Sequence, residues 1–117
     1  MIIKVVSDFT DIPGARYKQQ GPFSGECFRE EILYPKFIES EKKQEELIVD
    51  LDGGYGYGSS FLEEAFGGLV RKLSEENFKN IYDVKKIKII SYDNPVWIDK
   101  IAGYIDSAID NLKKGAK

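Results

Sequence analysis

Histidine is absent from this sequence, and its absence excludes several kinds of chemistry at once. A Ser-His-Asp triad, a histidine general base and a histidine metal site all depend on that side chain. Cysteine is nearly absent too: Cys27 stands alone, so the chain can form no internal disulfide and no cysteine-based zinc site. Asp8, Asp50, Asp52 and Asp93 lie at or near strand ends and offer a magnesium site as an alternative, but strand-end aspartates commonly serve as turn or capping residues. We therefore expect no metal site and no cofactor in this protein.

Long apolar runs and a strong charge of either sign are also lacking. The longest apolar runs span about five residues, whereas a membrane helix needs roughly 20. The first residues, from Met1 to Val6, lack the charged and apolar regions of a signal peptide. The 17 Lys and Arg against 20 Asp and Glu give a net charge of −3, which argues against a dedicated nucleic-acid binder. We expect a cytoplasmic protein with no membrane and no nucleic-acid partner.

What the chain does contain is enough for one folded domain. Its 117 residues are 42% hydrophobic, which favours a packed interior over disorder, and we assign residues 1–117 to a single domain. Runs at residues 2–6, 47–51 and 87–90 predict strands, and the run at 47–51 is apolar enough for a strand covered on both faces. Helical periodicity follows Ser24, Ser60 and Asn94. This alternation predicts a small α/β fold with a central, mostly parallel sheet of roughly three to five strands and about three main helices.

Local signals predict where the helices begin and end. Ser24 is suited to be an N-cap, because its hydroxyl can accept a hydrogen bond from an amide of the first turn. Pro35 lacks an amide N–H, so we expect it to end or kink the helix that follows Ser24. Residues 39–46 are highly charged and predict a solvated turn. Ser60 and Glu63 have the spacing of a capping box at the start of the next helix.

The most informative segment is rich in glycine and follows the strand predicted at 47–51. Gly53 and Gly58 have the spacing of a phosphate-binding P-loop, but the residues that follow are two serines rather than Lys and Ser, which disfavours nucleotide hydrolysis. The segment also lacks the Gly-x-Gly-x-x-Gly pattern of dinucleotide sites and the Gly-x-Ser-x-Gly pattern of hydrolases. With no histidine to activate a serine, we predict no catalytic residue and no enzyme.

Two helix starts offer a possible anion site. A helix that begins near Ser60 directs free amides and the positive end of its dipole at the loop above it. Because loops at the carboxyl ends of parallel strands gather on one edge of a sheet, we expect Ser24 and Ser59 to share a rim. Arg16 and Arg29 would then act as anion clamps. In the alternative, the serines only cap helices, the glycines only turn the chain, and the arginines pair with nearby acids or face solvent.

The same segment offers contacts for a protein partner. Tyr55 and Tyr57 lie on the glycine-rich loop, where we expect both side chains to be partly exposed. Exposed tyrosines are favoured as anchors of protein interfaces. Glu63, Glu64 and Arg71 lie on the polar face of the following helix and are further candidate contacts, the alternative being plain solvated surface.

Two stretches of the chain resemble the STAS-like domain family of unknown function. They are residues 48–53 with residues 56–69, while Arg16-Tyr17, residues 21–26 and Phe28-Arg29 look like the family's upstream motif. The family is named for its similarity to STAS domains, including bacterial anti-sigma factor antagonists, which are non-enzymatic switches bound by kinases related to histidine-kinase ATPases. In those proteins a serine at the start of the helix after the central strand is phosphorylated, within an Asp-Ser-Ser-Gly segment.

The resemblance implies a fold, a partner and a modified residue. It implies a STAS-like fold and places the Asp-Ser-Ser-Gly segment on residues 58–61, so that Ser59 is the candidate phospho-acceptor and Ser60 the second candidate. It also implies a protein partner of the anti-sigma-factor type, a histidine-kinase-like ATPase. Whether the domain forms a homodimer stays open.

Our leading hypothesis is a non-catalytic cytoplasmic regulatory module that binds a protein through residues 53–61, from Gly53 to Phe61, and the following helix. The alternative is a small-ligand or nucleotide-phosphate-binding domain that uses the paired helix starts. The residues expected to contact a partner or an anion are Arg16, Ser24, Gly25, Arg29, Gly54, Tyr55, Gly56, Tyr57, Gly58, Ser59 and Ser60.

Overall fold

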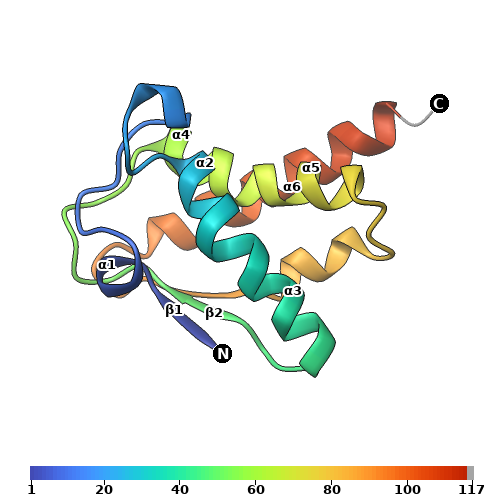
Figure 1. The fold of residues 1–117 in the computed structure, drawn as a ribbon, viewed down its shortest axis with the longest axis horizontal. Coiled ribbons are helices and arrows are strands. Elements are labelled where there is room, and N and C mark those ends of the chain that lie inside the picture. The colour runs from blue at the N-terminus through green and yellow to red at the C-terminus, as the bar shows by residue number, and fades with distance from the viewer. Residues whose placement is uncertain (116–117) are drawn as a thin grey trace.

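Three short parallel strands form the sheet at the base of the molecule. The computed structural model describes residues 1–115, and its strands are β1 (Ile2–Lys4), β2 (Ile48–Asp50) and β3 (Lys88–Ile90) (Figure 1). They lie in the order β1-β2-β3, with Ile3 opposite Val49 and Val49 opposite Ile89. The three predicted strands and their parallel arrangement are therefore confirmed, although each is only three residues long. Val5 and Val6, predicted as part of the first strand, instead begin the short helix α1 (Val5–Asp8).

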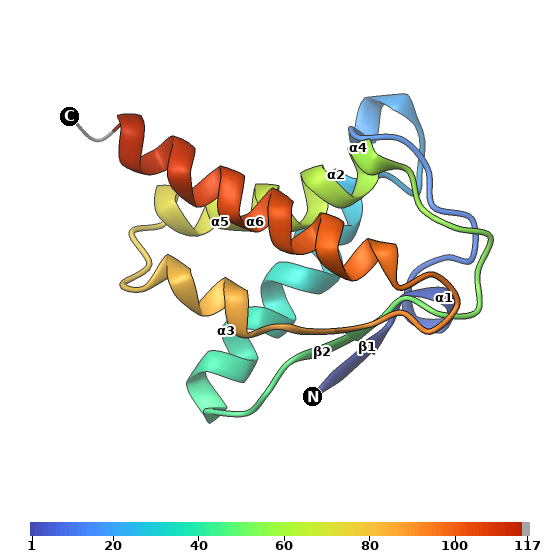
Figure 2. The same ribbon diagram turned by 180° about the vertical axis from the view of Figure 1, so that it is seen from behind.

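Three long helical segments connect or follow the strands, as the sequence predicted (Figures 1 and 2). The first consists of α2 (Gly25–Phe28), η2 (Arg29–Leu33) and α3 (Tyr34–Lys43). The second consists of α4 (Ser59–Leu62), η3 (Glu63–Gly67) and α5 (Gly68–Glu75), and the third is α6 (Val96–Gly115). Shorter elements are α1 (Val5–Asp8), η1 (Lys18–Gln20) and η4 (Ile81–Lys86). Both η2 and η3 are π-helical turns that widen an otherwise regular helix.

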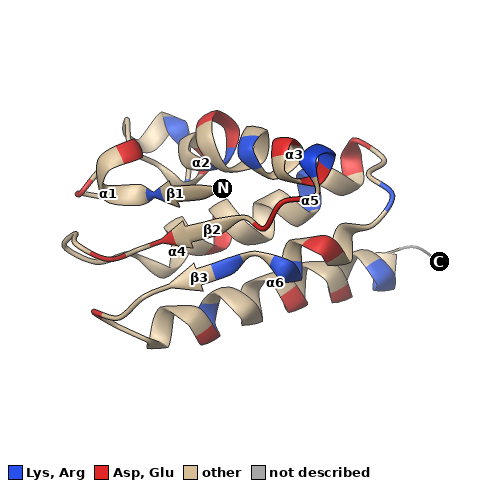
Figure 3. Cartoon of the chain, turned by 90° about the horizontal axis from the view of Figure 1, so that it is seen from below, with Lys and Arg blue, Asp and Glu red and all other residues tan. Residues whose placement is uncertain are grey.

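The helices lie on one side of the sheet, which leaves its other face open. Figure 3 looks at the molecule from below and shows the strands in front of the helices. Side chains alternate accordingly: Ile3 and Val49 are buried, whereas Ile2 is 48% exposed. On the central strand Val49 is buried while Ile48 and Asp50 are half-buried, so the prediction of a strand covered on both faces is confirmed for one face only. The apolar character of a sequence run does not by itself distinguish a strand that is covered on both faces from a strand that is covered on one face.

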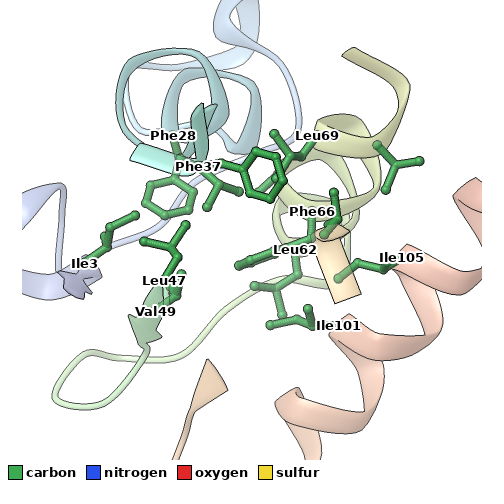
Figure 4. Close-up of a cluster of buried hydrophobic side chains, with 14 of the residues drawn as sticks. Ile3, Phe28, Phe37, Leu47, Val49, Leu62, Phe66, Leu69, Ile101 and Ile105 are labelled. Carbon is green, nitrogen blue, oxygen red and sulfur yellow. The ribbon is translucent and has the colours of Figure 1, made fainter. Parts of the chain in front are cut away.

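The core fills the space between the sheet and the three long helical segments. Figure 4 shows Val49 from the sheet together with Phe28 and Phe66 from two different helices and Ile101 from α6. Each is at most 1% exposed, and burying a side chain of this size contributes about 1.5–3 kcal/mol. The predicted periodicity of the helices therefore does identify the side chains that form the core.

The first long helical segment corrects two predictions. Pro35 lies inside α3 and does not end the helix, because the N–H of Tyr34 bonds to the carbonyl of Arg29 and so widens the turn before the proline. The helix continues to Lys43 and ends at Gln44, whose φ of 55° is left-handed. Most of the turn predicted at residues 39–46 is thus helical.

The starts of the two long segments differ from each other. Ser24 is the N-cap of α2, as predicted, and its Oγ accepts a hydrogen bond from the N–H of Cys27 at 3.0 Å. At the second start the N-cap is Gly58, which has no side chain, so the predicted capping box of Ser60 and Glu63 is wrong. The Glu63 carboxylate instead forms an ion pair with the Arg71 guanidinium of the same helical segment, with a nitrogen–oxygen distance of 2.9 Å.

No helix in the part of the chain that the structure describes is long and apolar enough to cross a membrane.

Candidate functional site

The loops that leave the carboxyl ends of the three strands meet at one edge of the sheet, which we call the carboxyl rim (residues 9–14, 51–58 and 91–95). The glycine-rich loop is joined to the first of them by a hydrogen bond from the N–H of Tyr55 to the carbonyl of Asp11 at 3.3 Å. Gly53 and Gly56 have φ values of 96° and 109°, where a side chain would strain the backbone. These glycines therefore set the path of the loop.

Two aspartates lock the glycine-rich loop to the loop that follows β3. The carboxylate of Asp52 accepts hydrogen bonds from the N–H groups of Tyr92 and Asp93, at 3.0 and 2.9 Å. The carboxylate of Asp93 in turn accepts one from the N–H of Gly53, at 2.9 Å. The carboxyl rim is thus held by reciprocal bonds between segments about 40 residues apart.

The two tyrosines of the glycine-rich loop have opposite environments. Tyr55 is 86% exposed, as predicted, but Tyr57 is only 8% exposed, so its predicted exposure is wrong. The Tyr57 hydroxyl donates to the carbonyl of Leu51 at 2.9 Å, and its ring packs against Phe61 and Trp97. Burial raises the pKa of Tyr57 above its ordinary value, and the nearby carboxylates of the strand end add to the effect.

Sequence reasoning missed two exposed apolar residues of the carboxyl rim. Ile12 is 63% exposed on the loop after β1, and Tyr92 is 84% exposed on the loop after β3. With Tyr55, each of the three loops therefore exposes one large apolar side chain. The available signal was an apolar residue among turn-forming neighbours, but only the sheet order brings the three loops together.

The predicted serines occupy different positions. Ser59 and Ser60 are both exposed at the start of α4, and neither hydroxyl caps the helix because Gly58 is the N-cap. Ser24 is fully buried, and its hydroxyl is the N-cap of α2. The two helix starts do touch: a Cβ on Gly25 would overlap the carbonyl oxygen of Phe61. Of the two serines expected to share a rim, Ser24 is therefore enclosed and Ser59 is open.

The two predicted anion clamps are paired with glutamates. The Arg16 guanidinium lies 2.5 Å from a carboxylate oxygen of Glu63 and 3.3 Å from one of Glu64. The Arg29 guanidinium lies 2.6 Å from Glu64, and both of these side chains are 11% exposed. Arg29 also donates to the backbone carbonyl of Glu64 at 2.8 Å. The structure therefore brings Arg16 and Arg29 together, but each is turned onto a carboxylate.

These residues are part of a larger group of ion pairs that we call the charge cluster. Its members, from the loop before α2, from η2 and from the second long segment, are Arg16, Arg29, Glu30, Glu63, Glu64, Arg71 and Lys72. Burial alone would raise the pKa of Glu63, but hydrogen bonds from Arg71 and Arg16 outweigh it and hold the pKa below its ordinary value. Burial likewise opposes the ionised forms of Glu30 and Arg29, yet their partners lower the pKa of Glu30 and raise that of Arg29.

Glycines let the two helices approach closely at the charge cluster. A Cβ on Gly68 would meet the guanidinium of Arg29, whose Cζ lies 3.2 Å from that position. Arg29 and Glu64 lie in η2 and η3, the two π-helical turns, which face each other across the contact. The pair Gly67-Gly68 inside an otherwise apolar helix was the sequence signal for this close approach.

A hollow of about 390 Å³ lies on the carboxyl rim between the glycine-rich loop and the start of α6. The residues that line it include three aromatic ones, Tyr55, Tyr57 and Trp97, and two acidic ones, Asp52 and Asp93. Tyr57 and Trp97 meet edge to face, with ring centroids 6.4 Å apart. Metal ligands do not gather here: among the described residues, no group of three or more Asp, Glu or Cys is arranged to hold a metal ion.

These features define a small α/β domain with an open sheet face and a rim of exposed apolar side chains. The model of one protein family, the STAS-like domain of unknown function (DUF4325), matches residues 24–97. Because the match covers more than half of the chain, this protein belongs to that family, which confirms the resemblance found in the sequence. The matched region includes the glycine-rich loop, both serines and most of the charge cluster. No curated protein and no solved structure matches the chain.

Proposed function

We propose that this domain is a non-catalytic regulatory module that binds a protein partner through the carboxyl rim. Residues 53–61 and the start of the helix that follows form the centre of the proposed surface. The observation that carries the proposal is the exposure of Ile12, Tyr55 and Tyr92, one on each loop of the rim. Large apolar side chains gathered on one exposed edge are typical of interaction sites, and tyrosine is among the residues that contribute most to binding energy.

The rigidity of the carboxyl rim supports the proposal. Asp52 and Asp93 tie the glycine-rich loop to the loop after β3, and Tyr57 anchors it to the core. A surface that is already ordered loses less conformational entropy when it binds. The same carboxylates are occupied by backbone amides, which fits a structural use better than acid–base catalysis.

Phosphorylation of Ser59 is the proposed switch. The Ser59 side chain is exposed at the first turn of a helix, where the dipole favours a negative group by about 0.3–1 kcal/mol. A phosphate there would add about −1.5 to −2 charges beside the exposed Tyr55 loop without disturbing the fold. The family's likeness to anti-sigma factor antagonists makes a histidine-kinase-like ATPase the proposed partner class.

The alternative, a cradle for a small phosphate-containing ligand, has less support. It requires Arg16 and Arg29 to be free for an anion, yet both are paired with glutamates. It also requires the Ser24 hydroxyl to face a ligand, yet that residue is fully buried. The carboxylates of the rim would further repel an anion. The geometry therefore favours the protein-interaction hypothesis.

Affinity capture from the native cell tests the proposal. We expect the wild-type domain to retain a partner that Tyr55→Ala loses at least tenfold, because truncating an interface tyrosine commonly costs more than about 1.4 kcal/mol. Tyr82→Ala is the matched control, since Tyr82 is also exposed but lies in η4, which leads into the amino end of β3. Equal capture by wild type and Tyr55→Ala would overturn the proposal.

The switch has its own measurement. Ser59→Asp should change the affinity for the captured partner in a calorimetric titration, while Ser107→Asp, an exposed position in α6, should not. Mass spectrometry of the domain from the native cell should find phosphate on Ser59. Equal affinities of the two variants would contradict the proposed phosphorylation switch but would not contradict the proposed binding surface.

A further inference from the structure

We infer that the hollow of the carboxyl rim receives an arginine or lysine side chain, so that the partner presents a basic segment to this domain. This inference rests on the proposed function, because it specifies the chemistry of the partner at the same surface. It goes beyond that function by assigning a subsite, a ligand class and the residues that recognise it.

The walls of the hollow combine aromatic rings with carboxylates. Tyr55 stands on the glycine-rich loop and Trp97 in the first turn of α6, and the edge-to-face contact with the buried Tyr57 fixes the indole of Trp97. A cation that lies over the face of a tryptophan or tyrosine is attracted by the ring's quadrupole. A hollow of about 390 Å³ is large enough for the end of one long side chain.

The charge of the hollow selects a cation. Asp52 and Asp93 line it, and the backbone amides that they accept from orient the two carboxylates without cancelling their charge. Two further acids are exposed nearby in the chain: Asp8 at the end of α1 and Asp11 on the rim loop that follows it. The basic side chain of β1, Lys4, lies on the exposed face of the sheet rather than among the residues that line the hollow.

A lysine of this chain, Lys100, already makes a cation–π contact with the Trp97 ring. The Nζ of Lys100 lies over the indole of Trp97, 5.4 Å from the ring centroid, and Lys100 does not line the hollow itself. The Trp97 ring therefore accommodates an ammonium group in this structure. A guanidinium is the better fit for the hollow, because its plane can stack on an aromatic ring while its edge donates to a carboxylate.

Trp97 is the single tryptophan of the chain, so its fluorescence reports on this hollow alone. The probe is an acetylated tetra-arginine amide, titrated into the full-length protein, with a tetraglutamate of the same length as the charge control. We expect a saturable change of fluorescence with tetra-arginine and none with tetraglutamate. A linear, unsaturable response that is equal for the two peptides would overturn the inference.

Variants sharpen the titration. Tyr55→Ala and Asp93→Asn should each weaken the binding of tetra-arginine by up to about fivefold, since one cation–π contact or one ion pair at an exposed site is worth at most that factor. The asparagine keeps the oxygen that accepts from Gly53, so the loop stays closed, and a thermal melt verifies the fold. Asp110→Asn changes the net charge equally but lies on an exposed part of α6, so its affinity should match wild type. Equal weakening by Asp93→Asn and Asp110→Asn would mean that only net charge matters and would overturn the subsite.

A competition experiment separates this inference from the proposed function. Tetra-arginine should release the partner that depends on Tyr55 in the capture experiment. A partner that depends on Tyr55 yet stays bound at saturating tetra-arginine would refute the basic segment while the proposed function stands. If tetra-arginine binds the hollow but no capture depends on Tyr55, the proposed function fails and the role of a partner's basic segment fails with it.

Discussion

The carboxyl rim and the charge cluster both contain carboxylates, but these carboxylates have different kinds of partner in the two regions. On the rim, Asp52 and Asp93 accept from backbone amides, and Tyr55 faces solvent. In the charge cluster, Glu64 meets Arg29 where the two side chains are almost completely enclosed. The difference shows that the presence of charges near a loop does not define a binding site. What decides is whether those charges already have partners of the opposite sign within the fold.

The largest loss in the free energy of unfolding is expected when the most buried ion pair of the charge cluster is removed. Glu64→Ala leaves the guanidinium of Arg29 without its shortest ion pair, and removing one partner of a buried pair costs about 3–5 kcal/mol of the free energy of unfolding. Chemical denaturation measures the loss. Glu75→Ala, an exposed position in the same long helical segment, should stay within about 0.5 kcal/mol of wild type. Equal losses in the two variants would mean that the charge cluster is ordinary surface.

A smaller effect is expected where the two helix starts touch. Gly25→Ala should lower the free energy of unfolding by about 1–3 kcal/mol, because the new methyl group overlaps the backbone carbonyl of Phe61, which cannot rotate away. Gly103→Ala is the opposite case: nothing lies within 4 Å of its Cβ position in α6, so the variant should gain up to about 1 kcal/mol. Thermal unfolding of both variants checks the contrast. A Gly25→Ala protein as stable as wild type would contradict the close contact between the helix starts.

The smallest effect is the pH dependence that Glu63 contributes. Its pKa in the folded protein is lower than in the unfolded chain, since Arg71 and Arg16 favour the carboxylate. The stabilisation is therefore fully present above the ordinary glutamate pKa of about 4.3 and is lost as the pH falls through the lower folded value. For a partly exposed pair we expect less than about 1 kcal/mol. Glu63→Gln should flatten this part of the stability curve between about pH 5 and pH 2, and an unchanged curve would contradict the assigned pairing.

Much of the fold could be predicted from local patterns. The strands at Ile3, Val49 and Ile89 and the N-cap at Ser24 follow from residue type and spacing, because backbone hydrogen bonds and side-chain periodicity act over a few residues. The helix through Pro35 was not predictable in this way. The π-helical turn that admits the proline is formed where Arg29 reaches the second long helix, a contact that no local pattern contains.

The candidate site was predicted only in part. The exposure of Tyr55 and of Ser59 agrees with the sequence-based expectation, whereas Tyr57, two residues further along the same loop, turns into the core and bonds to Leu51. Both tyrosines stand between glycines, so their local sequence is nearly the same. The difference arises from Trp97, which comes from a helix 40 residues away and packs on one ring only.

The sequence by itself determined the family, the parallel α/β architecture and the absence of histidine and disulfide chemistry, because each of these depends on composition or on short-range spacing. The tertiary structure decided which charges are free and which are paired. Arg16 and Arg29 became part of a closed cluster, and Asp52 and Asp93 became the walls of an open hollow. The physical reason is that a charge is neutralised by whatever lies within a few ångströms of it, and those neighbours come from segments far apart in the chain.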